Sequence, residues 1–275
     1  MPTIASMLAE VNGVKLAYSD TGPGPDLTVL LVHGYPLNRS MWDPQLGALR
    51  TVARVIAPDL RGFGASEDGP RGPLTVEQHA DDLAGLLDVL GITEPVVYVG
   101  LSMGGYIGFA FWRRHSQRVR AYVLADTRAS ADSEEARANR RDLIARTDEL
   151  NSSRAAIESM MPKMLAPGLR AGSLPEMLTR AMMSTTSPRT IVDAARGLAA
   201  RPDSLDLLPS IDVPTLIVVG ELDQLTPPSD SEAMLARLPN ARLERIDQAG
   251  HMANLENPEQ FNEVVLGWLS SIAGR

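Results

Sequence analysis

One stretch decides the fold, Val96-Val97-Tyr98-Val99-Gly100-Leu101-Ser102-Met103-Gly104-Gly105-Tyr106. Its first residues are apolar and typical of a buried strand, and a helix is expected to begin at Met103. Gly100 and Gly104 lie two residues to either side of Ser102, where side chains would collide across a sharp turn. Such a turn holds the serine hydroxyl exposed at the end of the strand, as in a nucleophile elbow. The stretch therefore predicts a reactive serine on a strand–turn–helix unit.

The composition is typical of one large globular domain with an insertion. The 275 residues are 44% hydrophobic and 22% charged, so a sizeable core can form. The net charge of −8 leaves no basic surface for phosphates, which argues against a nucleic-acid partner. Cysteine is absent, and this excludes disulfides, thiolate metal sites and a cysteine nucleophile.

The sequence also lacks the signals of export and of membrane insertion. Residues 1–26 contain no basic start followed by an apolar run, and no stretch of about 18 consecutive apolar residues occurs. We therefore expect a cytoplasmic protein that does not contact a membrane.

Strands and helices alternate around the elbow. Asn12-Gly13 is a strong two-residue turn signal and predicts an antiparallel hairpin. Continuous apolar runs elsewhere predict strands that are buried on both faces of a sheet. The expected strands are residues 7–12, 14–20, 27–32, 52–57, 96–99, 119–124, 214–219 and 241–246. Helices are expected between them, the first at residues 40–50. The pattern predicts an α/β fold with a doubly wound, mainly parallel, eight-stranded sheet.

The strand signal disappears between residues 127 and 200. Residues 132–149 are rich in Arg, Glu and Asp, with Leu143 and Ile144 among them, which is typical of a solvated amphipathic helix. The alternation of strand and helix resumes at residue 214. We therefore expect a helical cap at residues 127–200, inserted into one core domain made of residues 1–126 and 201–275.

Two further polar residues follow predicted strands at the same edge of the sheet as Ser102. A serine hydroxyl is a poor nucleophile at neutral pH and needs a base, which in turn needs an acid to orient it. His251 follows the last predicted strand, and Asp223 follows the strand before it. The sequence thus offers Ser102 as nucleophile, His251 as base and Asp223 as the orienting acid.

Other polar residues compete with this assignment. Asp126 is the alternative acid, because it follows the strand that precedes the insertion. Asp59 is expected to be structural, with Arg61 as its partner. His79 and His115 fall in predicted helices and are expected to be surface or hydrogen-bonded core histidines. His33 precedes Gly34 in a turn after a buried strand and should hydrogen-bond its loop in place.

Acyl transfer also needs N–H donors for the oxyanion of the tetrahedral intermediate. The backbone N–H of Met103 directly follows Ser102, at the positive end of the helix dipole. The second donor is expected to be the backbone N–H of Tyr35, in the turn that Gly34 permits. Pro36 has no N–H to donate.

Five motifs together resemble the α/β-hydrolase superfamily, specifically its small bacterial carboxylesterases and its members similar to 3-oxoadipate enol-lactonase. They are Leu-Val-His33-Gly-Tyr-Pro-Leu, Pro-Asp59-Leu-Arg-Gly-Phe-Gly, Gly-Leu-Ser102-Met-Gly-Gly, Gly-Glu-Leu-Asp223 and Gly-His251-Met. The resemblance implies the α/β-hydrolase fold and a serine mechanism without cofactor or metal. It implies acylation of Ser102, proton transfer by His251 and hydrolysis of the acyl-enzyme by water. The turn around Asp223 resembles the family's acid turn, which favours it over Asp126.

The first functional hypothesis is a carboxylesterase that acts on small-molecule esters with short to medium acyl chains. An enol-lactonase of aromatic catabolism, a cofactor-free perhydrolase of the haloperoxidase type and a carbon–carbon hydrolase use the same residues and remain alternatives. A ligand-binding protein that keeps the fold without turnover is the alternative from another class. The protein is expected to be a monomer or a small homo-oligomer.

The sequence gives softer indications about the substrate pocket. Trp42 follows the loop of Tyr35, and the expected cap is rich in methionine, whose flexible side chains can line an apolar acyl site. The expected pocket residues are Trp42, Met160, Met161 and Met164. No arginine fork for a substrate carboxylate is evident, which argues against acidic substrates, although the arginine-rich cap leaves them open.

Overall fold

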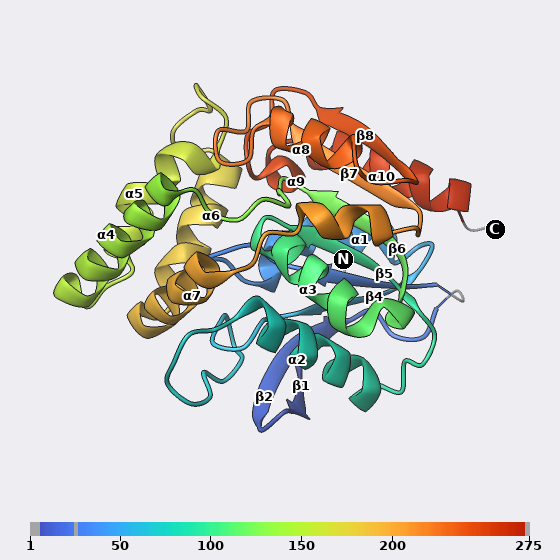
Figure 1. Ribbon diagram of the computed structural model, residues 1–275, viewed down its shortest axis with the longest axis horizontal. Coiled ribbons are helices and arrows are strands. Elements are labelled where there is room, and N and C mark those ends of the chain that lie inside the picture. The colour runs from blue at the N-terminus through green and yellow to red at the C-terminus, as the bar shows by residue number, and fades with distance from the viewer. Residues whose placement is uncertain (1–5, 25–26, 273–275) are drawn as a thin grey trace.

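The computed structural model describes residues 6–24 and 27–272. Its strands form one sheet of eight, in the order β1-β2-β4-β3-β5-β6-β7-β8 (Figure 1). They are β1 (Ser6–Val11), β2 (Val14–Asp20), β3 (Thr28–Val32), β4 (Arg54–Pro58), β5 (Val96–Leu101), β6 (Val119–Ala125), β7 (Thr215–Gly220) and β8 (Ala241–Ile246).

The sheet is mainly parallel, with one antiparallel edge. β1 and β2 form the hairpin expected around Asn12-Gly13, where both residues have positive φ angles. β2 also pairs antiparallel with β4, whereas the pairs from β3 to β8 are parallel. The carboxyl ends of β3, β5, β6 and β7 consequently meet at one edge of the sheet, as the eight-stranded prediction requires.

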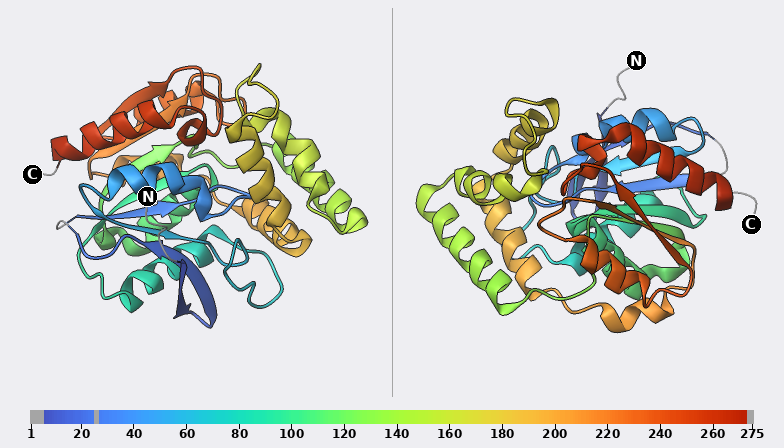
Figure 2. Two further views of the ribbon diagram at one scale, coloured as in Figure 1. Left: turned by 180° about the vertical axis from the view of Figure 1, so that it is seen from behind. Right: turned by 90° about the horizontal axis from the view of Figure 1, so that it is seen from above.

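Helices cover both faces of this sheet. α1 contacts α10 and α2 contacts α3, and Figure 2 shows these two pairs on opposite faces. Among residues 6–24 and 27–272, no helix has the length and apolar composition that a membrane span needs. The helices are η1 (Arg39–Trp42), α1 (Asp43–Leu49), α2 (Val76–Val89), α3 (Met103–His115), η2 (Ser116–Arg118), α4 (Glu134–Leu150), α5 (Arg154–Met164), α6 (Leu174–Thr185), α7 (Pro188–Ala200), η3 (Leu205–Ser210), α8 (Pro228–Leu235), α9 (Ala253–Glu256) and α10 (Pro258–Ile272).

The helix expected at residues 40–50 is divided into η1 and α1. The Asn38 side chain caps η1 by accepting a hydrogen bond from the N–H of Ser40. Pro44 then lies in the first turn of α1, the place in an α-helix where the missing N–H of proline costs least. The proline thus explains why the α-helix starts later than the apolar pattern suggests.

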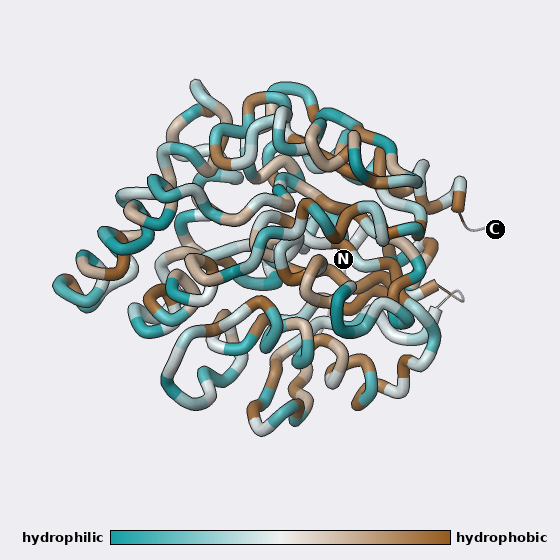
Figure 3. Tube along the Cα trace, viewed as in Figure 1, coloured by the Kyte–Doolittle hydropathy of each residue, from teal (hydrophilic) through white to brown (hydrophobic). Residues whose placement is uncertain are grey.

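Helices α4–α7, which we call the insertion, lie between β6 and β7 in the chain. Figure 1 shows them together beyond one end of the sheet, and α4 contacts both α5 and α7. Serine side chains cap two of these helices, Ser133 at α4 and Ser187 at α7. Much of α4 is hydrophilic (Figure 3), in agreement with the solvated helix expected there.

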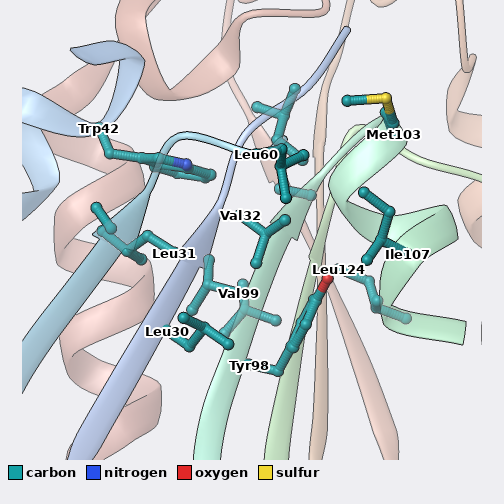
Figure 4. Close-up of a cluster of buried hydrophobic side chains, with 14 of the residues drawn as sticks. Leu30, Leu31, Val32, Trp42, Leu60, Tyr98, Val99, Met103, Ile107 and Leu124 are labelled. Atoms are coloured by element: carbon teal, nitrogen blue, oxygen red, sulfur yellow. The ribbon is translucent and has the colours of Figure 1, made fainter. Parts of the chain in front are cut away.

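The core lies against the central strands. Leu30, Leu31 and Val32 of β3 are fully buried, and Figure 4 shows them beside Val99 of β5. The hydroxyl of Tyr98 donates to the carbonyl of Gly104 at 2.7 Å, which ties the buried strand β5 to the first turn of α3. Apolar burial on both faces therefore fixes the strand that carries Ser102 and the helix that follows it.

In the loop after β4, the expected pairing of Asp59 with Arg61 is wrong. Asp59 does not bind Arg61: its carboxylate accepts from the side chain of Arg39 and from the backbone N–H groups of Arg39 and Ala65, the latter two at 2.8 Å. Arg61 instead makes two hydrogen bonds of 2.7 Å to Asp82 on α2. The loop folds back over the Asp59 carboxylate, so donors from Arg39 and Ala65 occupy its oxygens in place of Arg61.

Candidate active site

The elbow has the backbone geometry that its glycines predict. Ser102 lies between β5 and α3 with φ 55° and ψ −112°, a conformation that residues other than glycine rarely adopt. A Cβ atom on Gly100 would lie 2.4 Å from the carbonyl oxygen of Gly104, and one on Gly104 would lie 2.2 Å from that of Val32. Only glycine fits at these two positions, and the turn holds Ser102 at the end of the strand.

The loop after β3 is held beside the elbow by His33. The backbone N–H of Leu60 donates to Nε2 of His33 at 3.0 Å, so Nδ1 carries the proton and donates to the carbonyl of Gly34 at 2.9 Å. Burial lowers the pKa of His33, in keeping with a neutral ring. The expectation that His33 fastens its loop is confirmed.

His251 and Asp223 are in direct contact. Nδ1 of His251 lies 2.8 Å from Oδ2 of Asp223, and both side chains are buried. The Asp223 carboxylate also accepts from the hydroxyl of Thr226 at 2.7 Å and from two backbone N–H groups, of Leu225 and Thr226. Burial alone would raise the pKa of Asp223, but the charge of His251 and these hydrogen bonds hold it below its usual value. The position and the lowered pKa of Asp223 agree with the acid expected to orient His251.

Ser102 and His251 line one cavity of about 390 Å³. Within the described part of the chain, the hydrogen-bond partners of His251 are Asp223 and Thr226, so its ring does not bond Ser102 directly. Nucleophile and base are often further apart in a free enzyme than in the complex with substrate. The structure therefore brings Ser102, His251 and Asp223 to one place, without a hydrogen bond between the serine and the histidine.

Two residues that line the same cavity offer backbone N–H groups. Tyr35 and Met103 both line it, and neither N–H has a hydrogen-bond partner among residues 6–24 and 27–272. Met103 is the first residue of α3, whose N-terminal N–H groups have no partner within the helix. Free donors beside Ser102 are what an oxyanion requires.

Asp126, the alternative acid, is buried beyond the end of β6, and the hydrogen bonds of the described residues do not join it to His251. Its Oδ1 accepts from the N–H of Gly220 at 2.8 Å, while Oδ2 has no partner in the described part of the chain. Burial and the nearby charge of Asp223 raise the pKa of Asp126 well above its usual value. Geometry favours Asp223 over Asp126 as the residue that orients His251.

The raised pKa of Asp126 predicts how a substitution acts on stability. A folded protein that holds a proton more tightly than the unfolded chain loses stability as the pH rises through that carboxyl's titration. Asparagine cannot ionise and keeps an acceptor for the N–H of Gly220. Asp126→Asn is therefore expected to become more stable than the wild type as the pH rises, by about 1–3 kcal/mol at pH 8, with little change in turnover.

Urea unfolding of both proteins at pH 5 and pH 8 measures this effect. A difference in the free energy of unfolding that is the same at both pH values would contradict the raised pKa of Asp126.

Only some of the pocket residues expected from the sequence line the cavity. Met160 lines the cavity, whereas Trp42, Met161 and Met164 do not, so the expectation is wrong for these three. Trp42 is fully buried and its ring lies 6.2 Å from that of Phe261, because the loop after β3 turns it into the core. On α5, Met161 and Met164 are one helical turn apart and share a buried face, while Met160 lies on the face that the cavity meets.

Glu256 is a site residue that the sequence did not indicate. Its Oε1 accepts from the N–H groups of Gly250 at 3.0 Å and Met252 at 3.3 Å, on either side of His251. Its Oε2 accepts from the N–H of Ala166, in the loop after α5, at 2.7 Å. Burial raises the pKa of Glu256 despite these hydrogen bonds. The local sequence does not indicate the contact with Ala166, which lies 90 positions away in the chain.

The cavity also contains basic side chains that were not expected. Arg128 and Arg140 line its wall together with Tyr106 and Leu143. The spacing of residues 136, 139, 140 and 143 places them on one face of α4. The sequence contains this spacing, but it does not say which face of the helix lines the cavity.

The model of the alpha/beta hydrolase family matches residues 29–264. This chain belongs to that family. A 3-oxoadipate enol-lactonase of Acinetobacter baylyi is 28% identical to this hydrolase over 270 residues, 97% of each chain. A putative non-heme chloroperoxidase of Synechocystis is 29% identical over 93% of this chain and 95% of its own.

The solved structure of a thermophilic esterase from Thermogutta terrifontis, with malate bound, is similar along almost the whole chain. Its TM-score is 0.91 and its sequence is 40% identical, with 98% of this hydrolase and 99% of the esterase covered. Together with the eight-stranded, mainly parallel sheet, the family match confirms the fold and the resemblance inferred from the motifs.

Proposed function

We propose that this hydrolase cleaves carboxylic esters of short to medium acyl chains through an acyl-enzyme on Ser102. The observation that carries the proposal is the 2.8 Å contact between His251 and Asp223, because His251 also lines a cavity with Ser102. The free N–H groups of Tyr35 and Met103 in the same cavity supply the remaining requirement of acyl transfer.

Each group has a role in the proposed mechanism. Because Asp223 accepts from Nδ1 of His251, the proton of the neutral ring lies on Nδ1 and Nε2 is left to accept the Ser102 proton. The Ser102 oxygen then attacks the ester carbonyl, and the N–H groups of Tyr35 and Met103 stabilise the resulting oxyanion. Collapse of this intermediate releases the alcohol, which takes its proton from His251.

Water completes the reaction by the same route. His251 takes a proton from water as it attacks the acyl-enzyme, and the released serine takes the proton back. The carbonyl of a lactone is attacked in the same way, so the Acinetobacter relative supports enol-lactone hydrolysis as a second candidate. In the perhydrolase alternative, which the Synechocystis relative supports, hydrogen peroxide replaces water in the second step.

A series of p-nitrophenyl esters from acetate to decanoate tests the proposal, with Ser102→Ala measured beside the wild type. We expect turnover to peak at a short or medium chain, because a cavity of about 390 Å³ is near the small end of ligand sites. Turnover of the enol-lactone derived from muconolactone is measured separately. Strong lactone turnover with feeble ester turnover would favour the second candidate, and binding without Ser102-dependent turnover of any substrate would favour a ligand-binding protein.

A further inference from the structure

The cavity wall is basic, although the net charge of the whole chain is −8. Four cationic side chains line the cavity and one carboxylate does, among the described residues: Arg128, Arg140, Arg146 and Lys163 against Asp142. A positively charged wall attracts an anionic ester and does not act on the net charge of a neutral one.

The arginines of α4 are sorted between the cavity and the solvent. Arg140 and Arg146 lie on the face that lines the cavity, and Nη2 of Arg146 also donates to Glu158 at 2.8 Å. Arg137 and Arg141 do not line it and lie within salt-bridge distance of Glu134 at the exposed start of the helix. The cationic lining is therefore not a general property of this arginine-rich helix.

Three guanidinium groups share one carboxylate beneath this wall. Asp132 is buried and accepts from Nε of Arg140 at 2.5 Å, from Nη1 of Arg201 at 2.5 Å and from Nη2 of Arg128 at 3.3 Å. Asp230 is a second carboxylate near these groups, 3.9 Å from Nη1 of Arg128. The positive charge of the cluster exceeds the negative charge that these two carboxylates supply.

Arg140 is held so that its outer nitrogens stay available. Asp132 binds it through Nε, and its two Nη groups have no hydrogen-bond partner among residues 6–24 and 27–272. The side chain is only 17% exposed and lines the cavity. Two parallel N–H groups on a fixed, largely desolvated guanidinium match the two oxygens of a carboxylate.

We infer that the preferred substrate of this site is an ester that carries a carboxylate, which binds the Nη groups of Arg140 with Arg128 beside it. The inference rests on the proposed function and adds a substrate class to it. Leu143 and Met160 line the same cavity and accommodate the apolar chain between the carboxylate and the ester. It also reverses the expectation, drawn from the sequence, that argued against acidic substrates.

Matched pairs of esters test the inference. The monomethyl esters of succinate, glutarate and adipate are each compared with methyl butanoate, pentanoate and hexanoate, in which a methyl group replaces the carboxylate. A second pair, 4-acetoxybutanoate and butyl acetate, places the carboxylate on the alcohol side. We expect kcat/KM to favour the anionic member by about 10- to 100-fold in at least one arm, as hydrogen bonds to charged groups provide.

Variants locate the effect. Arg140→Gln is expected to lower the ratio of anionic to neutral kcat/KM by about 10-fold or more, and any general loss of activity cancels in this ratio. Arg141→Gln, one residue along the same helix, is the matched control and should keep the ratio of the wild type. An equal fall in both variants would overturn the assignment to Arg140.

A binding measurement separates this inference from the proposed function. In the Ser102→Ala background, glutarate at ten times its Kd should raise Tm by about 3 °C, and Arg140→Gln but not Arg141→Gln should abolish the shift. Ser102-dependent turnover without preference for an anionic ester overturns the inference and leaves the proposed function. If no ester is turned over, the proposed function fails, and the glutarate shift then supports anion binding while its absence overturns it.

Discussion

Ser102→Ala is expected to lower kcat for the best ester by a factor on the order of 10⁴–10⁶ and to leave the fold intact. In the proposed mechanism alanine removes the oxygen that attacks the carbonyl, so the acyl-enzyme on Ser102 cannot form. Backbone donors at Tyr35 and Met103 remain, so the variant should still exceed the uncatalysed rate in water. Steady-state kinetics on p-nitrophenyl esters gives the factor.

Covalent labelling provides an independent check on this prediction. A fluorophosphonate should add to Ser102 of the wild type, as mass spectrometry of the labelled peptide would show, and should not label the variant. The Tm and the near-ultraviolet circular dichroism of the variant should match those of the wild type. A variant that keeps more than a hundredth of the activity would indicate that another group is the nucleophile.

Asp223→Asn is expected to lower kcat by about 10⁴-fold. The amide of asparagine presents N–H groups where Asp223 accepts from Nδ1 of His251, so the ring proton moves to Nε2 and the base is lost. The cation that forms on His251 during the reaction also loses its neighbouring negative charge. Kinetics of Asp223→Asn beside Asp126→Asn measures the effect, and a larger loss in the second variant would make Asp126 the orienting acid.

The lowered pKa of Asp223 has a consequence for acid stability with a definite sign. A carboxyl whose pKa is lower in the folded protein contributes stability that is present above its ordinary pKa and is lost as the pH falls through the lowered value. Asp223→Asn removes this contribution. The wild type and the variant should therefore differ most in the free energy of unfolding near neutral pH and converge in acid.

Local sequence chemistry was sufficient to predict the sheet and the elbow. Asn12-Gly13 admits the two positive φ angles of the hairpin, and Gly100 and Gly104 leave room where a Cβ would strike backbone. These constraints act within a few residues, so they are legible without the rest of the chain. The position of His251 and Asp223 at one edge followed from the parallel order of the strands.

Partners that are distant in the chain could not be predicted in this way. Arg61 is two residues from Asp59, yet it binds Asp82 on α2, because the packing of α2 decides which carboxylate it meets. The contacts of Trp42 and Arg140 could not be predicted for the same reason. The sequence gives the chemistry of each side chain, whereas the placement of a loop or of a helix face decides what it contacts.

The carboxylate of Glu256 makes the insertion and the histidine loop structurally inseparable. One oxygen receives N–H groups from both sides of His251, and the other receives the N–H of Ala166. An insertion transplanted from a relative must therefore supply a backbone donor at position 166. A graft with proline there would remove the donor of the Glu256 oxygen and is expected to loosen the loop that carries His251, so an exchange of insertions has to preserve that single N–H.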